Sequence, residues 1–381
     1  MANEHSTLAL TGGRFLTPSG ILDDVALRLE DGRITLEGST GNLRPTRDLG
    51  GKLVLPGIVD IHGDAFERTL APRPGVMMPM PLALAENDAA CLAAGITCAF
   101  LSATDSFEPG LRGRDTLRQL RAGVATTPLA VDTRLHVRHE ICRVEDHGEL
   151  LEWLHSGQIH LLSTADHLPN GEDPVKAKRY RNAAARRLSL GATALDQLIA
   201  TAQANRDLGR QQEQELAAAA RVLGIPLASH DDDSPEMVAA ALARGVTISE
   251  FPLDPTVAAL ARTGGAQVLM GAPNYIRGGS HVAWMGVAEA LAADVVDCLC
   301  SDYHYPSLFH APWNMALAGH RNFAAAWAMV SDAPAQAAGL AGRKGRITDG
   351  HDGDLLVVDD RGPMPRLCEV WVGGHLRALF A

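Results

Sequence analysis

Imidazoles and carboxylates recur at the ends of short apolar runs in the middle of this 381-residue chain. Both groups are the ligands that Zn²⁺, Mn²⁺, Fe²⁺ and Ni²⁺ take in proteins. Burying them without partners would be unfavourable, and a bound cation removes that cost. We therefore predict a site for one or two divalent ions, either zinc or manganese, iron or nickel. Its predicted ligands are His62, Asp64, Glu140, His167, His230 and Asp302.

Spacing assigns roles within this set. Residues two apart on a strand face the same way, so we expect His62 and Asp64 to hold one ion together. Glu140 is the candidate to bridge two ions, with His167 and His230 as further ligands. A different role, orienting the ligating imidazoles, is open to Asp231, Asp232 and Glu250. The histidines expected to be structural are His136, His139, His155, His160 and His320.

The elements that must position these residues form an alternating pattern. Eight continuous apolar runs, of the kind buried on both faces of a parallel sheet, lie at 57–61, 96–102, 131–140, 159–166, 225–229, 246–251, 267–271 and 295–301. Helical candidates between them include 82–94, 195–223, 235–243, 255–263 and 282–293. Eight such units predict an α/β fold, a TIM-type (β/α)8 barrel, in which the carboxyl ends of all strands meet at one mouth.

Both ends of the chain differ from the middle. They carry short strand-like runs separated by Gly, Asp and Pro, without helix-length periodicity. We therefore expect a small β-sandwich domain formed from both termini, residues 1–55 and 340–381, beside a barrel domain at 56–339.

Composition excludes several classes of function. Hydrophobic residues make up 46% of the chain and charged residues 21%, as in a globular enzyme, and the formal charge of −11 argues against nucleic acid as a partner. No uninterrupted apolar span or signal peptide is visible, so we expect a cytoplasmic protein with no membrane partner. The six scattered cysteines are expected to be reduced and mostly buried. Homo-oligomerisation stays open.

Several segments are similar to a known family. Residues 55–62, LPGIVDIH, resemble the first-strand signature of the amidohydrolase superfamily. The usual His-x-His is replaced here by His62-Gly63-Asp64, which resembles the branch that hydrolyses α-D-ribose 1-methylphosphonate 5-triphosphate. Further matching segments are 69–74, 134–140, 228–232, 270–274, 277–281 and 301–303.

The resemblance implies a diphosphatase of phosphonate metabolism, acting on a small phosphorylated substrate to leave a 5-phosphate and pyrophosphate. A metal ion lowers the pKa of a bound water and so supplies such a reaction with hydroxide near neutral pH. Asp302 is our candidate to orient and deprotonate that water, and Asp231 is the second catalytic candidate.

A polyanionic substrate needs local positive charge in a chain of net charge −11. Glycines that allow close backbone approach, together with arginine, are typical of phosphate sites, and TIM barrels often bind phosphate near their last strands. A plain turn is the alternative for the glycines. A solvated helix face is the alternative for the cluster of basic residues at 176–187, which follows the end of a predicted strand. The substrate-binding candidates are Arg73, Lys176, Arg179, Asn274, Arg277, Gly278, Gly279, Ser280 and His281.

Two other functions compete with this one. The same metal chemistry would serve an amidohydrolase acting on an amide, a lactone or an amino-heterocycle, or on other ribose or nucleoside triphosphates. The third possibility is not an enzyme: a non-catalytic scaffold protein that kept the barrel fold but lost the chemistry. Metal analysis of the purified protein distinguishes such a scaffold from the hydrolases.

Overall fold

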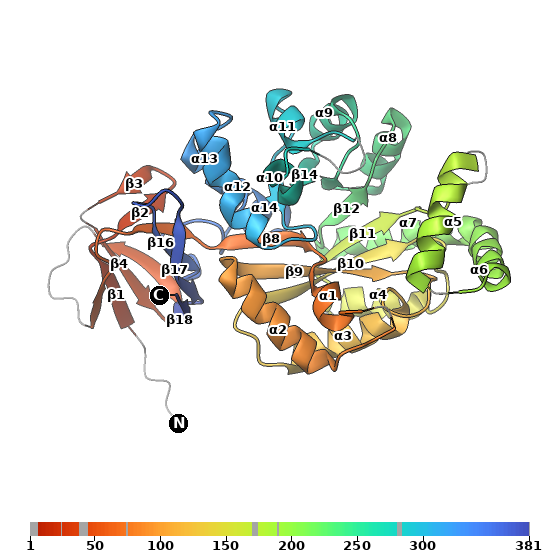
Figure 1. Cartoon of the computed structure of the whole chain (residues 1–381), viewed down its shortest axis with the longest axis horizontal. Helices are drawn as coiled ribbons and strands as arrows, with labels where there is room; N and C mark the ends of the chain where they lie inside the picture. The colour runs from red at the N-terminus through yellow and green to blue at the C-terminus, as the bar shows by residue number, and fades with distance from the viewer. Residues whose placement is uncertain are drawn as a thin grey trace.

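The computed structural model describes residues 7–23, 25–37, 45–73, 75–169, 174–188, 190–279 and 284–380, without the side chain of Lys176. Within these ranges no helix has both the length and the apolar character that crossing a bilayer requires. The chain forms a parallel barrel with helices around it and two mixed sheets at one end of the molecule (Figure 1).

Eight parallel strands form the barrel in sequence order: β8 (Ile58–Gly63), β9 (Ile96–Asp105), β10 (Asp132–Glu140), β11 (Leu161–Ala165), β12 (Leu227–His230), β13 (Ile248–Glu250), β14 (Gln267–Gly271) and β15 (Cys298–Cys300). The last strand returns to the first through a parallel bridge between Gly63 and Asp302. Two backbone hydrogen bonds of 2.9 Å join these ends, from Asp302 N to His62 O and from Asp64 N to Asp302 O. The predicted barrel is confirmed.

Each predicted apolar run overlaps one barrel strand, and the bounds of β14 agree with the prediction at both ends. The interior is filled by small and branched side chains such as Val59, Ile61, Leu161, Ile248 and Leu269, all fully buried. Cys298 and Cys300 also belong to this core, and none of the six cysteines forms a disulfide. A packed interior leaves only the two ends of the barrel available for chemistry.

The helices are α1 (Phe66–Leu70), α2 (Met80–Ala93), α3 (Arg114–Thr126), α4 (His147–His155), α5 (Pro174–Leu188), α6 (Ala192–Ala204), α7 (Arg206–Leu223), α8 (Pro235–Arg244), α9 (Pro255–Thr263), α10 (Ala272–Ile276), α11 (Val287–Ala292), α12 (Pro306–Leu317), α13 (Phe323–Ala328) and α14 (Asp332–Ala337). The single helix predicted at 195–223 is wrong, because a turn at Asn205 divides it into α6 and α7. The helix predicted from 282 begins only at Val287.

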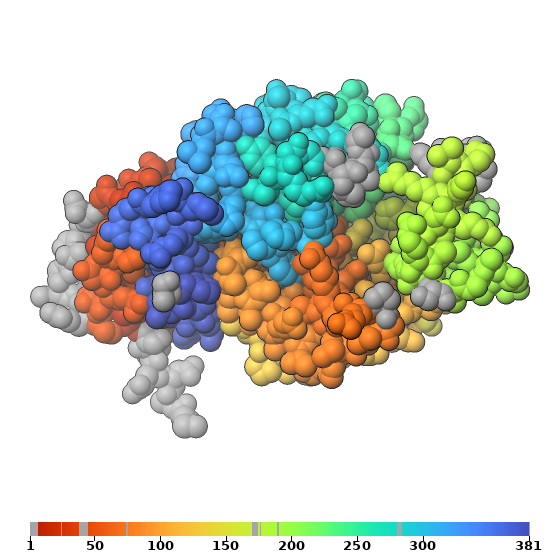
Figure 2. All heavy atoms as spheres, viewed as in Figure 1, coloured from red at the N-terminus to blue at the C-terminus, as the bar shows by residue number. Residues whose placement is uncertain are grey.

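A glycine contact lets the first turn of α7 lie against the segment after β10. A Cβ atom at Gly209 would lie 1.9 Å from the carbonyl oxygen of Ile141, so only glycine lets α7 approach the segment after β10. This contact fixes the first turn of α7 at the mouth of the barrel. The two helices that precede α7 are α5 and α6. They project from the end of the molecule opposite the terminal sheets, as the yellow-green segment of Figure 2 shows.

Both ends of the chain build the mixed sheets, as the sequence predicted. One has the order β5 (Arg33–Glu37), β4 (Ala26–Glu30), β1 (Thr7–Thr11), β6 (Thr46–Asp48), and the other β18 (His375–Leu379), β17 (Arg366–Val372), β16 (Leu355–Asp359), β7 (Leu53–Pro56), β2 (Arg14–Thr17), β3 (Gly20–Leu22). Leu10 and Leu27 of the first sheet share a core with Phe15 and Trp371 of the second. The β7–β16 pairing joins the two termini, and β7 leads directly into barrel strand β8.

Candidate metal centre

His62 faces the barrel interior because β8 contains a bulge. Val59 and Ile61 already face the core, so strict alternation would turn His62 away from it. Asp60 pairs with Ala99 and Gly63 with Leu101, which gives β8 one extra residue at this point. The bulge reverses the alternation and brings the His62 ring 5.1 Å from that of His136, centroid to centroid.

Glu250 of β13 holds His62 in place. Its Oε1 lies 2.8 Å from His62 Nδ1, and both side chains are almost fully buried. Burial, with the nearby charge of Arg138, lowers the pKa of His62 well below its usual value, so the ring is neutral and Nδ1 donates to the carboxylate. The lone pair of Nε2 is then available to a metal ion, the arrangement in which a carboxylate orients a ligating histidine.

His136 serves as structural support, in agreement with the sequence analysis. Both of its ring nitrogens have hydroxyl partners at 2.9 Å, Ser102 on Nδ1 and Ser163 on Nε2. Burial lowers the pKa of His136 to about 3, so the ring is neutral. With both nitrogens engaged, it has no lone pair to offer to an ion.

His230, at the end of β12, joins two groups of ligand atoms. Single ligand atoms of His62, His230 and Glu250 lie within 4.8 Å of one another, and so do those of His167, His230 and Asp231. The rings of His167 and His230 are 5.3 Å apart, centroid to centroid. His230 is therefore the residue that belongs to both candidate metal sites.

Glu140 of β10 contacts the second group through His167. One carboxylate oxygen bonds His167 Nδ1 and the other accepts the backbone N–H of His167 at 3.3 Å. The charge of Glu140 raises the pKa of His167 to about 10 against the effect of burial. Burial acts to raise the pKa of Glu140 itself, but the charge and hydrogen bonds of His167 outweigh it and the net shift is downward.

The residues present fit a divalent ion. Among the described side chains, Glu250 Oε2 and His230 Nδ1 are buried and make no hydrogen bond, although Asp231 Oδ1 lies 3.3 Å from the latter. Buried polar atoms are normally satisfied, so two such atoms in one cluster call for a partner. A carboxylate oxygen and imidazole nitrogens are the donor set that zinc and its neighbours prefer.

Asp302 and Asp64 lie at the same mouth, linked by the backbone bonds that close the barrel. Neither belongs to the two groups of three ligand atoms, so the expected pairing of His62 with Asp64 is not what brings the ligands together. Burial and the charge of Asp64 raise the pKa of Asp302 to about 7. Gly271 makes room for it, because a Cβ there would lie 3.0 Å from Asp302 Oδ2.

The predicted substrate-binding residues are scattered. Arg73 and Arg179 are exposed, and Arg277 bonds the hydroxyl of Tyr303 at 3.1 Å, next to Asp302. Gly278, with φ of +79°, and Gly279, whose N–H donates to Asn274 O, end α10 as a helix cap, which is the alternative given for them above. Asn274 Oδ1 is buried without a hydrogen bond. Ser280, His281 and the side chain of Lys176 lie outside the described residues.

Three arginines that are not among the predicted substrate-binding residues line a cavity of about 250 Å³ beside the ligand groups. They are Arg112 before α3, Arg138 of β10 and Arg187 of α5; Glu140, His167, His230 and Asp231 line the same cavity. Arg138 donates to His230 Nε2 at 3.0 Å and lies 3.7 Å from Asp64. Arg138 lies two residues from both His136 and Glu140 on the same strand, and this spacing was a usable signal in the sequence. Arg187 belongs to the basic cluster at 176–187, which was also a signal, whereas nothing in the sequence marked Arg112.

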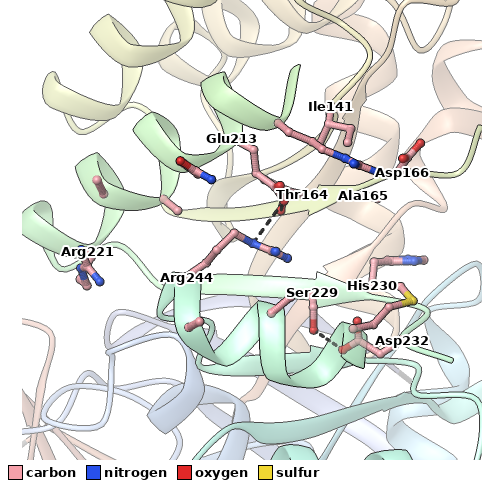
Figure 3. A pocket seen from close by; sticks show the side chains of 17 residues that line it. Ile141, Thr164, Ala165, Asp166, Glu213, Arg221, Ser229, His230, Asp232 and Arg244 are labelled. Atoms are coloured by element: carbon pink, nitrogen blue, oxygen red, sulfur yellow. Dashed lines mark hydrogen bonds and ion pairs between the residues drawn. The ribbon is translucent and has the colours of Figure 1, made fainter. Parts of the chain in front are cut away.

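A larger hollow of about 910 Å³ lies on the outer wall of the barrel, between α7 and α8 (Figure 3). Four of its polar side chains bond one another, since Thr164 donates to Glu213 at 2.7 Å and Ser229 to Asp232 at 2.6 Å. Of the two ligand groups it includes only His230. The smaller cavity at the mouth is therefore the better candidate for the substrate.

The chain resembles one characterised enzyme along most of its length. It is 30% identical over 358 residues to α-D-ribose 1-methylphosphonate 5-triphosphate diphosphatase of Escherichia coli (strain K12), a match that covers 92% of this chain and 94% of that protein. No family model matches the chain.

Solved structures show the same fold at lower identity. A crystal structure of an amidohydrolase superposes with a TM-score of 0.61 at 17% identity, covering 98% of this chain and all of that one. An adenosine deaminase from Xanthomonas campestris with bound zinc gives 0.58 at 13% identity, over 98% and 93% of the two chains. At these identities the likeness concerns the fold alone.

Proposed function

The chain belongs to the amidohydrolase superfamily, and from this membership and the geometry of the mouth we propose that it is a metal-dependent hydrolase of a ribose 5-triphosphate. The substrate that we propose is α-D-ribose 1-methylphosphonate 5-triphosphate, the one named for the Escherichia coli relative. The products are then the 5-phosphate and pyrophosphate.

One observation carries the choice of a phosphate substrate: three arginines line the cavity that adjoins the candidate metal ligands. Arginine binds phosphate oxygens through two parallel hydrogen bonds, and guanidinium groups stabilise the charge that develops during phosphoryl transfer. Glu108, Glu140 and Asp231 line the same cavity, so the arginines supply guanidinium donors there rather than a net positive charge. A neutral amide or heterocycle would not need these donors.

His62 and His230 would hold an ion with Glu250 beside them, or His167, His230 and Asp231 would hold it. The neutral imidazole of His230 has one lone pair, so it would bind one ion at a time. When bound, a divalent ion lowers the pKa of a coordinated water from about 15.7 towards about 7, which makes hydroxide available near neutral pH. Glu250 orients the imidazole of His62, and Glu140 orients that of His167. The two carboxylates thus fix the ligating rings before substrate arrives.

In the proposed reaction a water oxygen attacks the phosphorus nearest the ribose. The new P–O bond forms as the bond from that phosphorus to the oxygen bridging to the next phosphate breaks, and pyrophosphate leaves. Asp302, at the end of β15 and joined to His62 through the backbone, is the group that takes the proton of the attacking water. Arg138 lies where it can offset the charge on the phosphoryl oxygens.

A panel of substrates tests this proposal. We expect pyrophosphate release from 5-triphosphorylated ribosides, with the methylphosphonate riboside preferred, and no turnover of neutral dihydropyrimidines, lactones or acylated amino sugars. With oxygen-18 water the label should appear in the 5-phosphate and not in the pyrophosphate. Turnover of a neutral substrate together with inert triphosphates would instead favour another amidohydrolase reaction.

A further inference from the structure

Glu108 is a buried carboxylate in the wall of the mouth cavity. It follows the end of β9, is 4% exposed, and lies with Arg187 among the residues that line the cavity. Two guanidinium nitrogens of Arg187 bond its two oxygens, Nε at 2.8 Å and a terminal nitrogen at shorter range. The hydroxyl of Tyr180 donates to it at 3.2 Å.

This contact joins two segments that are distant in sequence. Arg187 and Tyr180 belong to α5, in the long connection between β11 and β12. Phe107, beside Glu108, packs with Tyr180 in a small apolar cluster that includes Ile141 and Leu168. The cluster holds the helix in position, so the Arg187–Glu108 pair is not the only contact between α5 and the barrel.

We propose that the Glu108 carboxylate binds the Arg187 guanidinium where a phosphate binds when substrate is present. Arg187 then binds the distal phosphates of the substrate once they displace this carboxylate. The inference rests on the proposed function and deepens it. Arg187 then distinguishes a triphosphate from a monophosphate, because the terminal phosphates extend away from the candidate metal ligands towards α5.

Charge and geometry support the exchange. A carboxylate presents two oxygens to the guanidinium fork in the way that a phosphate does, so the two anions compete for the same donors. Arg187 is about one-third exposed and can reach a ligand in the cavity, whereas Glu108 is confined to the wall. Arg112 is held similarly, in two hydrogen bonds to Glu67.

The test is the affinity of the holoenzyme for inorganic pyrophosphate, measured by calorimetry. Glu108→Gln should bind pyrophosphate about tenfold more tightly than wild type, because a charged competitor has been removed. Arg187→Gln should bind about tenfold more weakly. In the double variant the gain from Glu108→Gln should vanish, since it acts through Arg187. Arg186→Gln, an exposed neighbour that does not line the cavity, is the matched control and should bind like wild type.

The outcomes separate the two proposals. A wild-type holoenzyme that binds no pyrophosphate overturns the proposed function. If wild type binds it and Glu108→Gln binds no more tightly, or if the gain survives in the Arg187→Gln background, the inference is wrong and the pair is only structural. Should Glu108→Gln fail to fold, Glu108→Asp withdraws the carboxylate from Arg187 while keeping the charge, and unchanged affinity in that variant overturns the inference equally.

Discussion

Replacing His230 with alanine should remove the bound metal and abolish hydrolysis. His230 is the residue common to both groups of ligand atoms, so its loss leaves two ligands at each position. Even residues that only orient a ligand typically contribute 10–100-fold in metal affinity, so we expect the dissociation constant for zinc to rise by at least about 100-fold. Competition with a chromophoric chelator measures that constant independently of turnover.

Two variants serve as controls for this result. His167→Ala removes a ligand from one group only and should keep the ion held by His62, His230 and Glu250. His155→Ala removes a histidine at the exposed end of α4 and should leave both metal content and activity unchanged. A His230→Ala protein that keeps wild-type metal content would show that the ligand groups identified at the mouth are not the metal centre.

Replacing Lys344 with alanine should destabilise the fold by about 3–5 kcal/mol, the typical cost of removing one partner from a buried ion pair. Its side chain is 3% exposed, and its ammonium nitrogen lies 2.7 Å from Asp354, 3.1 Å from Asp132 and 3.2 Å from Asp352. Asp132 begins barrel strand β10, whereas Asp352 and Asp354 precede β16 of the terminal sheet. Lys344 therefore joins the barrel to the sheets.

Urea denaturation followed by circular dichroism measures the effect on the first unfolding transition. Arg343→Ala is the matched control, because the neighbouring Arg343 also contacts Asp352 but is more than half exposed, and exposed pairs contribute roughly 0–1 kcal/mol. A Lys344→Ala protein no less stable than Arg343→Ala would mean that the three carboxylates find other partners and that the junction does not depend on this lysine.

The barrel was predictable because its signals are local. Buried parallel strands require continuous apolar runs, and each run lies between turn residues, so the bounds of β14 could be predicted to the residue. The convergence of His62, His230 and Asp302 then follows from the fold, since strand ends meet at one mouth. Asn205 shows the limit, because an Ala-rich helical pattern runs through it and no sequence signal marked the turn that separates α6 from α7.

The finer geometry of the site depends on contacts between residues that are distant in sequence, so the sequence pattern did not predict it. A single extra residue in β8 decides which way His62 points, and no sequence pattern marked the bulge. Glu250 could be named as a partner of an imidazole, but its contact with His62 spans 188 residues of chain. The arginines of the cavity come from three separated segments, and basic residues in a helix such as α5 look alike until the fold shows that Arg187 faces the mouth and Arg186 does not.

Metal-dependent hydrolysis is tested by measuring pyrophosphate release from the methylphosphonate riboside triphosphate with protein that is stripped of metal and then resupplied with one kind of ion at a time. We expect no release from the stripped protein, and recovery in proportion to bound Zn²⁺ or Mn²⁺ up to one or two ions per chain. Release that persists undiminished after the metal has been removed would show that the hydrolysis does not depend on a metal ion.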